Sequence, residues 1–152
     1  MNEETGAALA RMQAGADTPL TERVTHEAFA AVRPEQTGPM ADALNGIRKP
    51  VASTTLDEAH WNSTTVTDGD VITFLKDLKQ QPGGNISLSG SITPTRTLLE
   101  AGLLDELRLL VHPLVPGTGK RLFPHGTGRA PLRLTTSATF STGVPDLTSP
   151  PA

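Results

Sequence analysis

The chain has 152 residues, a formal net charge of −3 and no cysteine. A chain of this length predicts one domain, residues 1–152, that can enclose a sizeable core. The scattered charges form neither a basic stripe for nucleic-acid phosphates nor a polybasic patch for a membrane surface, so we expect neither partner. The absence of cysteine excludes disulfides, thiolate catalysis and cysteine-based zinc sites.

The N-terminal segment, MNEETGAALARMQAGAD, is acidic at its start and has no apolar core. It does not resemble a signal peptide, and no segment reaches the roughly 20 apolar residues that a membrane-spanning helix needs. These features predict a cytoplasmic protein.

The first half of the chain predicts several short helices and strands. Apolar periodicity and the residues that flank it indicate helices at 3–15, 26–32 and 38–47. Alternating and β-branched residues indicate strands at 18–23, 49–56 and 62–66. Thr25 is the expected N-cap of the second helix.

The second half begins with a helix over residues 70–80, which places Phe74, Leu75 and Leu78 on one face. The following "QPGG" ends that helix. A long strand is expected at 104–117 and a closing hairpin at 131–148. Together these elements predict an α/β fold around a mostly parallel sheet with a C-terminal antiparallel hairpin.

The stretch "NISLSGSITPTRTLLEAG" between them contains the best candidate site. It predicts a strand at 85–90 and then a helix with Thr93 as its N-cap, Pro94 at its first helical position and Gly102 at its end. Free N–H groups and the positive end of the helix dipole at such a turn suit a phosphate. An ordinary strand-to-helix turn also favours Gly, Ser and Thr, so the local sequence leaves both interpretations open.

Other candidate sites have weaker support. The glycine-rich segment 115–128 carries Lys120 and Arg121, but a turn between strands explains it equally well. The four histidines show no paired ligand spacing, so we expect no metal site. The chain also lacks a Gly-x-Ser-x-Gly motif for a hydrolase.

Several motifs in order resemble a known family. They are "LNGIRKPVASTTL", "WNSTTV", "GGNISLSGSITPTRTLLEAGLLDELRLLVHPLVPGTGKRLF" and "TFSTGV". This series is similar to the bacterial dihydrofolate-reductase-like family that includes the C-terminal reductase domain of riboflavin biosynthesis, the RibD C-terminal domain family. The resemblance covers roughly residues 40–148 and is strongest from Gly83 to Phe123.

The resemblance implies a three-layer dihydrofolate-reductase-like fold that binds NADPH across the carboxyl ends of its central strands. It implies hydride transfer to a small heterocyclic or carbonyl substrate, as in a dihydrofolate reductase or a 5-amino-6-(5-phosphoribosylamino)uracil reductase. The cofactor-binding residues that it implies are Gly90, Ser91, Ile92 and Thr93 at the pyrophosphate, Arg23 and Thr25 nearby, and Ser53, Thr54 and Thr55 at the adenosine 2′-phosphate.

Three departures from the family pattern bear on these expectations. The family's opening hydrophobic strand and "SLDG"-type loop have no counterpart before the first expected helix, which predicts an N-terminally shortened domain. Glu22 stands where the family has glycine, and Thr54 stands where it has arginine beside the 2′-phosphate. The last change leaves NADH possible as the cofactor, with NADPH expected first.

The function that follows is an NAD(P)H-dependent reductase with no catalytic residue assigned. A diverged, non-catalytic homologue and a small-molecule-binding protein that keeps the fold are the alternatives. Because the loss of an interior strand would leave unpaired backbone groups, we also expect a homodimer.

Overall fold

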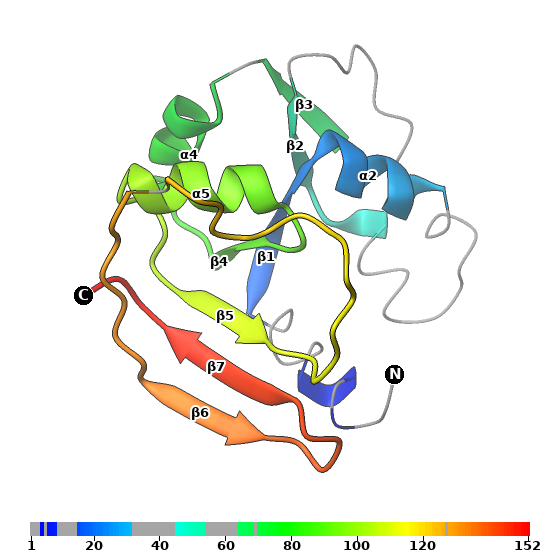
Figure 1. Cartoon of the computed structure of the whole chain (residues 1–152). Helices are drawn as coiled ribbons and strands as arrows, with labels where there is room; N and C mark the ends of the chain where they lie inside the picture. Colours follow the sequence, from blue (N-terminus) through cyan, green and yellow to red (C-terminus); the bar gives the residue numbers. More distant parts are fainter. Residues whose placement is uncertain are drawn as a thin grey trace. The chain divides into compact units, whose positions relative to one another are not determined.

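The computed structural model describes residues 4, 6–8, 15–31, 45–53, 64–68, 70–126 and 128–152. The chain divides into two compact units (Figure 1). One unit comprises residues 12–94, and the other combines residues 1–11 with residues 95–152. Whether they act as one domain, as the sequence predicts, stays a prediction.

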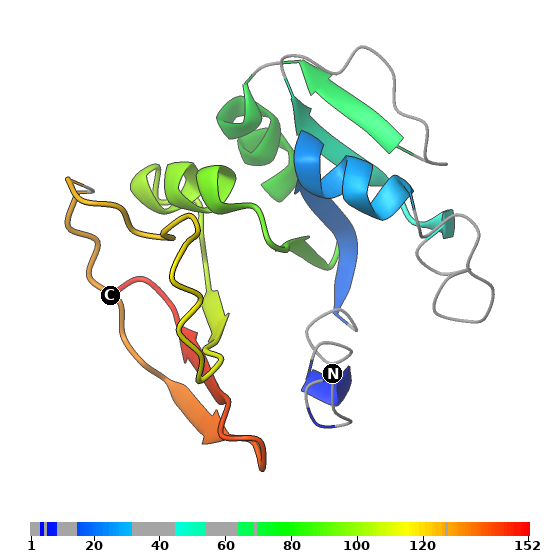
Figure 2. The same cartoon turned by 45° about the vertical axis from the view of Figure 1, so that its right-hand side comes forward.

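The unit formed by residues 12–94 contains a four-stranded parallel sheet (Figures 1 and 2). Its strands lie in the order β3-β2-β1-β4. They are β1 (Ala16–Glu22), β2 (Lys49–Ser53), β3 (Thr64–Asp68) and β4 (Asn85–Leu88). Leu20 and Val51 are fully buried in neighbouring strands, and helix α2 (Arg23–Ala30) packs on the same two strands. The burial of these aliphatic side chains anchors the sheet.

Helix α4 (Val71–Lys79) forms where its apolar periodicity predicts it. The Asp70 carboxylate caps it and accepts the N–H groups of Ile72 and Thr73 at 3.0 and 3.2 Å. Leu75 is buried, and the helix lies against β3. The cap satisfies two of the amide groups that a helix N-terminus leaves without partners.

Helix α5 (Ile92–Glu100) begins earlier than expected, so Thr93 is its second residue and is not its N-cap. The helix ends as predicted at Gly102, whose φ is 66°. Leu103 N–H donates to Leu98 O at 2.9 Å and Gly102 N–H to Leu99 O at 3.2 Å. This Schellman motif requires the left-handed conformation that glycine adopts without strain.

The C-terminal elements form a separate antiparallel sheet in the order β5-β7-β6. Its strands are β5 (Leu107–Leu110), β6 (Thr136–Thr139) and β7 (Pro145–Ser149). The expected hairpin is present, and Gly143 turns it with a φ of 79°. Pro145 is the first residue of β7, a position where proline is tolerated.

Two boundaries differ from the prediction. The strand expected at 104–117 is only four residues long, because Pro113 and Pro116 follow and neither has an N–H group for a ladder. Helix α2 begins at Arg23, so Thr25 lies inside it and does not cap it. The helices expected at 3–15 and 38–47 lie mostly outside the described residues, with helical backbone at 4, 6–8 and 45–46. The predicted fold class, a mixed α/β fold with a mostly parallel sheet and a C-terminal antiparallel hairpin, is confirmed.

Candidate functional site

The order of the parallel strands identifies the end of the sheet at which the strands terminate as the candidate site. This end is called the carboxyl edge below. From β1 the chain passes to β2 and β3 on one side and then returns to place β4 on the other side of β1. In open parallel sheets, ligands bind where the strand order reverses in this way, outside the carboxyl ends of the strands. Here that point lies between the carboxyl ends of β1 and β4.

Ser91 joins these two strand ends. Its side chain is almost fully buried, at 1% exposed. Its hydroxyl Oγ accepts the Glu22 N–H at 3.3 Å and makes a longer contact with Ser89 O, at 3.4 Å. The serine therefore holds the last residue of β1 against the turn that follows β4.

Gly90 and Thr25 face each other across this turn. Gly90 has a φ of 71°, which disfavours a side chain, and a Cβ added to it would lie 4.0 Å from Thr25 Oγ1. Thr25 is half-buried in the first turn of α2. A turn without a side chain at this point leaves its backbone accessible to a ligand.

Two helices begin at this edge. Helix α2 follows β1 without an intervening residue, and only residues 89–91 separate β4 from α5. Because β1 and β4 are paired and parallel, the two helix N-termini lie on adjacent strand ends. Free N–H groups and the positive dipole ends of both helices make this edge suitable for an anion.

Charged side chains near the two helix N-termini strengthen or oppose the positive electrostatic potential there. Arg23 makes a bidentate ion pair with Glu27 one turn later in α2, at 2.9 and 3.0 Å. Both side chains are about half exposed, and exposed pairs of this kind contribute only about 0–1 kcal/mol, so an anion could recruit Arg23 at low cost. Glu22 is half-buried at the end of β1, and its carboxylate opposes an anion there.

The remaining residues that the sequence predicts for the site have different positions. Ile92 is half-buried at the start of α5, and Thr93 is exposed. Ser53 ends β2, the neighbour of β1 on the side away from β4. Thr54 and Thr55 lie outside the described residues. The structure thus gathers Arg23, Thr25 and residues 90–93 at two adjacent strand ends and places Ser53 one strand farther along.

Sequence reasoning missed the contacts at the opposite edge that fix the pairing of β1 with β4. Asp17 lies at a register shift between Ala16 and Thr18, and its carboxylate accepts the Gly84 N–H. A Cβ on Gly84 would lie 3.1 Å from that carboxylate and 3.2 Å from Gly15 O, so a larger residue here would require these neighbours to shift slightly. The only sequence feature that could have indicated this close approach was the "GG" at positions 83 and 84, which we interpreted as a helix stop.

A buried lysine also lies away from the candidate site. Lys49 begins β2, so it is at the amino end of the sheet, and its ammonium group donates to Ile47 O at 2.8 Å and Asn45 O at 3.2 Å. Burial lowers the pKa of this side chain. These carbonyl partners give Lys49 a structural role.

Within the described ranges, no group of three His, Asp or Glu side chains is arranged to hold a metal ion. Within the same ranges, no helix has the length and apolar character to cross a bilayer.

The sheet topology, the serine- and glycine-containing turn and the paired helix starts define an α/β protein whose candidate site lies at the carboxyl ends of a parallel sheet. Residues 1–145 match the RibD C-terminal domain, and the chain belongs to that family. A curated relative, the uncharacterized protein YyaP of Bacillus subtilis (strain 168), is 36% identical over 97 residues. This match covers 64% of the present chain and 51% of YyaP, so the chain spans about half the length of this relative.

Solved structures share the fold at low sequence identity. A pyrimidine reductase-like protein from Corynebacterium diphtheriae has a TM-score of 0.72 and 13% identity, with 100% of this chain and 82% of that chain covered. Acinetobacter baumannii RibD has a TM-score of 0.69 and 14% identity, with coverage of 100% and 51%. These likenesses establish the fold of the chain.

Proposed function

We propose that the protein is an NAD(P)H-dependent reductase that transfers hydride to a small heterocyclic or carbonyl substrate. The observation that carries the proposal is the pair of helix N-termini on the adjacent carboxyl ends of β1 and β4, with Gly90 between them. Membership of the RibD C-terminal domain family supports it independently. NADPH is the first cofactor to test, and NADH is the second.

The residues at the sheet edge fit a dinucleotide phosphate in most respects. The backbone of Gly90, Ser91, Ile92 and Thr93 would hold the pyrophosphate, and Thr25 would add a hydroxyl. Arg23 would exchange Glu27 for a phosphate oxygen, because its ion pair is exposed and weak. Ser53 would lie toward the adenosine, with Thr54 and Thr55 proposed beside it.

The bound nicotinamide would supply the hydride, and the protein would bind and orient the reactants. Ser91 would act by positioning, since its buried hydroxyl holds the β1 end against the turn. No catalytic proton donor is assigned among the described residues.

Thermal-shift titration with NADPH and NADH tests the proposal. A ligand at about 100 times its dissociation constant stabilises the folded state by about 2.7 kcal/mol, which raises the melting midpoint by several degrees. We expect such a shift for the wild-type protein and its loss in Gly90→Ala. Gly102→Ala is a matched control, because Gly102 has nearly the same φ, 66° against 71°, and open space around it.

A cooperatively melting wild-type protein that shifts with neither nucleotide would contradict the proposal. Equal loss of binding in both glycine variants would also contradict it, because the effect would then come from general destabilisation.

A diverged, non-catalytic or merely ligand-binding homologue is the second candidate, and the half-buried Glu22 favours it. A carboxylate at the end of β1 repels a pyrophosphate. Under this alternative, Glu22→Gly should restore NADPH binding that the wild-type chain lacks. Measurable NADPH oxidation by the wild-type protein with any carbonyl or dihydropteridine substrate would exclude it.

We also propose a homodimer. Among the described strands, β4 pairs only with β1 and β5 pairs only with β7, so each has a second edge on which a strand could pair. Light scattering at micromolar concentration should give twice the monomer mass of 16.0 kDa, and a monomeric mass would contradict the proposal.

A further inference from the structure

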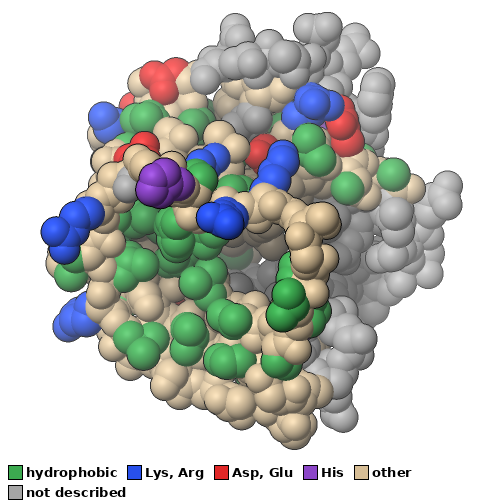
Figure 3. Space-filling model, viewed as in Figure 1, with side chains coloured by type: hydrophobic (Ala, Val, Ile, Leu, Met, Phe, Trp, Pro, Cys, Tyr) green, Lys and Arg blue, Asp and Glu red, His purple; other side chains and the backbone are tan. Residues whose placement is uncertain are grey.

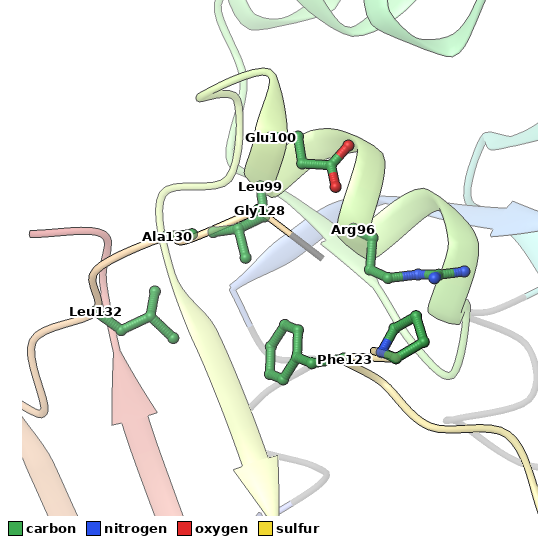
Figure 4. A pocket seen from close by; sticks show the side chains of 8 residues that line it. Arg96, Leu99, Glu100, Phe123, Gly128, Ala130 and Leu132 are labelled. Carbon is green, nitrogen blue, oxygen red and sulfur yellow. The ribbon is translucent and has the colours of Figure 1, made fainter. Parts of the chain in front are cut away.

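A cavity lies wholly within the unit that contains residues 95–152. It has a volume of about 250 Å³ and lies between the face of α5 that carries Arg96, Leu99 and Glu100 and the segment from Phe123 to Leu132 (Figure 4). The three helix residues share one face because they are three and four positions apart. The volume is slightly below the range typical of small-molecule sites, about 300–1,000 Å³, so only a compact ligand would fit.

Arg96 is the polar group of this cavity that most needs a partner. Its Nε is buried, and the described part of the chain offers it no hydrogen-bond acceptor. A buried donor without an acceptor is costly, and a guanidinium group pairs best with a carboxylate or phosphate. A carboxylate or phosphate would satisfy this donor and also pair with the charge of Arg96.

The rest of the cavity wall is largely apolar. Leu99, Phe123 and Leu132 line it, and in Figure 4 the Phe123 ring lies below α5 with the Leu132 side chain farther to the left. Phe123 is 42% exposed, so the cavity opens to the surface beside an aromatic ring. These side chains suit an aromatic or aliphatic group attached to the anion.

The surrounding segment is positively charged. Residues 111–135 contain Lys120, Arg121, Arg129 and Arg133 and no Asp or Glu. Lys and Arg side chains border apolar surface on this unit in Figure 3. Glu100 lines the cavity but is exposed, so water screens its charge. The local potential favours the approach of an anion.

We propose that this cavity binds a small organic anion, with its carboxylate or phosphate at Arg96 and its apolar body against Leu99, Phe123 and Leu132. The site does not depend on the proposed reductase function, because every residue that lines it belongs to the other unit.

Protein-observed NMR titration with phenyl phosphate tests the proposal, with phenol and inorganic phosphate as the two halves of the probe. We expect phenyl phosphate to bind more tightly than either half and to shift the amide signals of Gly128, Ala130 and Leu132. Benzoate in a parallel titration identifies the preferred anion. The shifted signals also separate this site from the edge at Gly90, so failure here leaves the reductase proposal intact.

Substitutions complete the test. Arg96→Gln should weaken phenyl phosphate binding by about tenfold or more, because a charge-assisted hydrogen bond is lost. Arg133→Gln is the matched control, since it removes a cation from the same segment without altering the cavity wall, and it should change affinity by less than about threefold. Ala130→Leu should abolish binding by filling the cavity, with the melting midpoint preserved.

Three outcomes would overturn the proposal. They are no binding of either aromatic anion to the wild-type protein at millimolar concentration, equal affinity for inorganic phosphate and phenyl phosphate, and equal losses in the Arg96 and Arg133 variants.

Discussion

The two sheets use their polar groups differently. In the parallel sheet, residues at the strand ends hold β1 and β4 together, with Asp17 at the amino edge and Ser91 at the carboxyl edge. In the antiparallel sheet, the buried Asp146 of β7 pairs with Arg108 of the neighbouring strand β5. The two side chains of an ion pair within a sheet satisfy each other's hydrogen-bonding groups. In the parallel sheet, by contrast, β1 and β4 lead into helices whose N-termini lie at the same end of the sheet. For this reason we expect the cofactor site in the parallel sheet.

Replacement of Asp146 should have the largest effect. Asp146 accepts Arg108 Nε at 2.8 Å and also contacts the second arm of the guanidinium group, which raises the pKa of Arg108. Asp146→Ala leaves a partly buried arginine without its partner, and we expect a loss of about 2–4 kcal/mol in unfolding free energy. Urea denaturation measures it.

The double variant Arg108→Leu/Asp146→Leu provides the control for this pair. It should be more stable than Asp146→Ala, because neither charge is then buried alone. If Asp146→Ala alone proved neutral, the antiparallel sheet would not depend on the ion pair between its strands. The contrast between the two sheets would then fail.

Gly90→Ala should have the second largest effect. A side chain in the left-handed region costs about 1–2 kcal/mol, and Gly102→Ala should cost a similar amount. Only the change at Gly90 should alter nucleotide binding, because only that glycine lies between the two helix starts. Melting midpoints without NADPH measure the backbone strain that both variants share. Midpoints with NADPH measure the loss of nucleotide binding that we expect only in Gly90→Ala.

The sequence predicted elements that have strong local signals. Helix α4 follows from its apolar period, and the end of α5 follows from Gly102. The candidate site was predictable as a strand, a glycine turn and a helix, because those features are adjacent in sequence. The start of α5 was placed too late, because Thr93 and Pro94 resemble a cap and a first-turn residue, whereas Ser91 precedes the observed helix.

The contacts that join distant segments were not predictable. Ser91 and Glu22 are 69 positions apart, and Arg108 and Asp146 are 38 positions apart. A side chain's partner across strands depends on strand order and register, which local periodicity does not specify. The cavity beside Arg96 escaped prediction for the same reason, since α5 meets residues 123–132 only in the folded unit.

Ser91→Ala tests the link between the strand ends and should have a smaller effect than either change above. The Glu22 N–H loses a long, 3.3 Å hydrogen bond, and we expect a loss of about 1 kcal/mol. Ser89→Ala, two residues earlier in the same turn, serves as the control and should have less effect because Ser89 is exposed. Amide hydrogen exchange at Glu22 should accelerate in the first variant only. Unchanged exchange there would show that the serine does not join β1 to the turn.

The smallest effect concerns pH and the amino edge of the parallel sheet. The Gly84 N–H and then the Thr18 hydroxyl lower the pKa of Asp17 below its ordinary value of 3.8. A carboxyl group with a depressed folded-state pKa contributes stability above its unfolded-state value, and this contribution is lost as the pH falls through the folded-state value. We therefore expect the stability difference between the wild-type protein and Asp17→Asn to shrink as the pH is lowered from about 5 to about 3. Asp77→Asn, on the exposed surface of α4, is the control. Parallel urea-midpoint profiles for the wild type and Asp17→Asn would show that the register shift, and not the carboxylate, holds β1 against β4 at this edge.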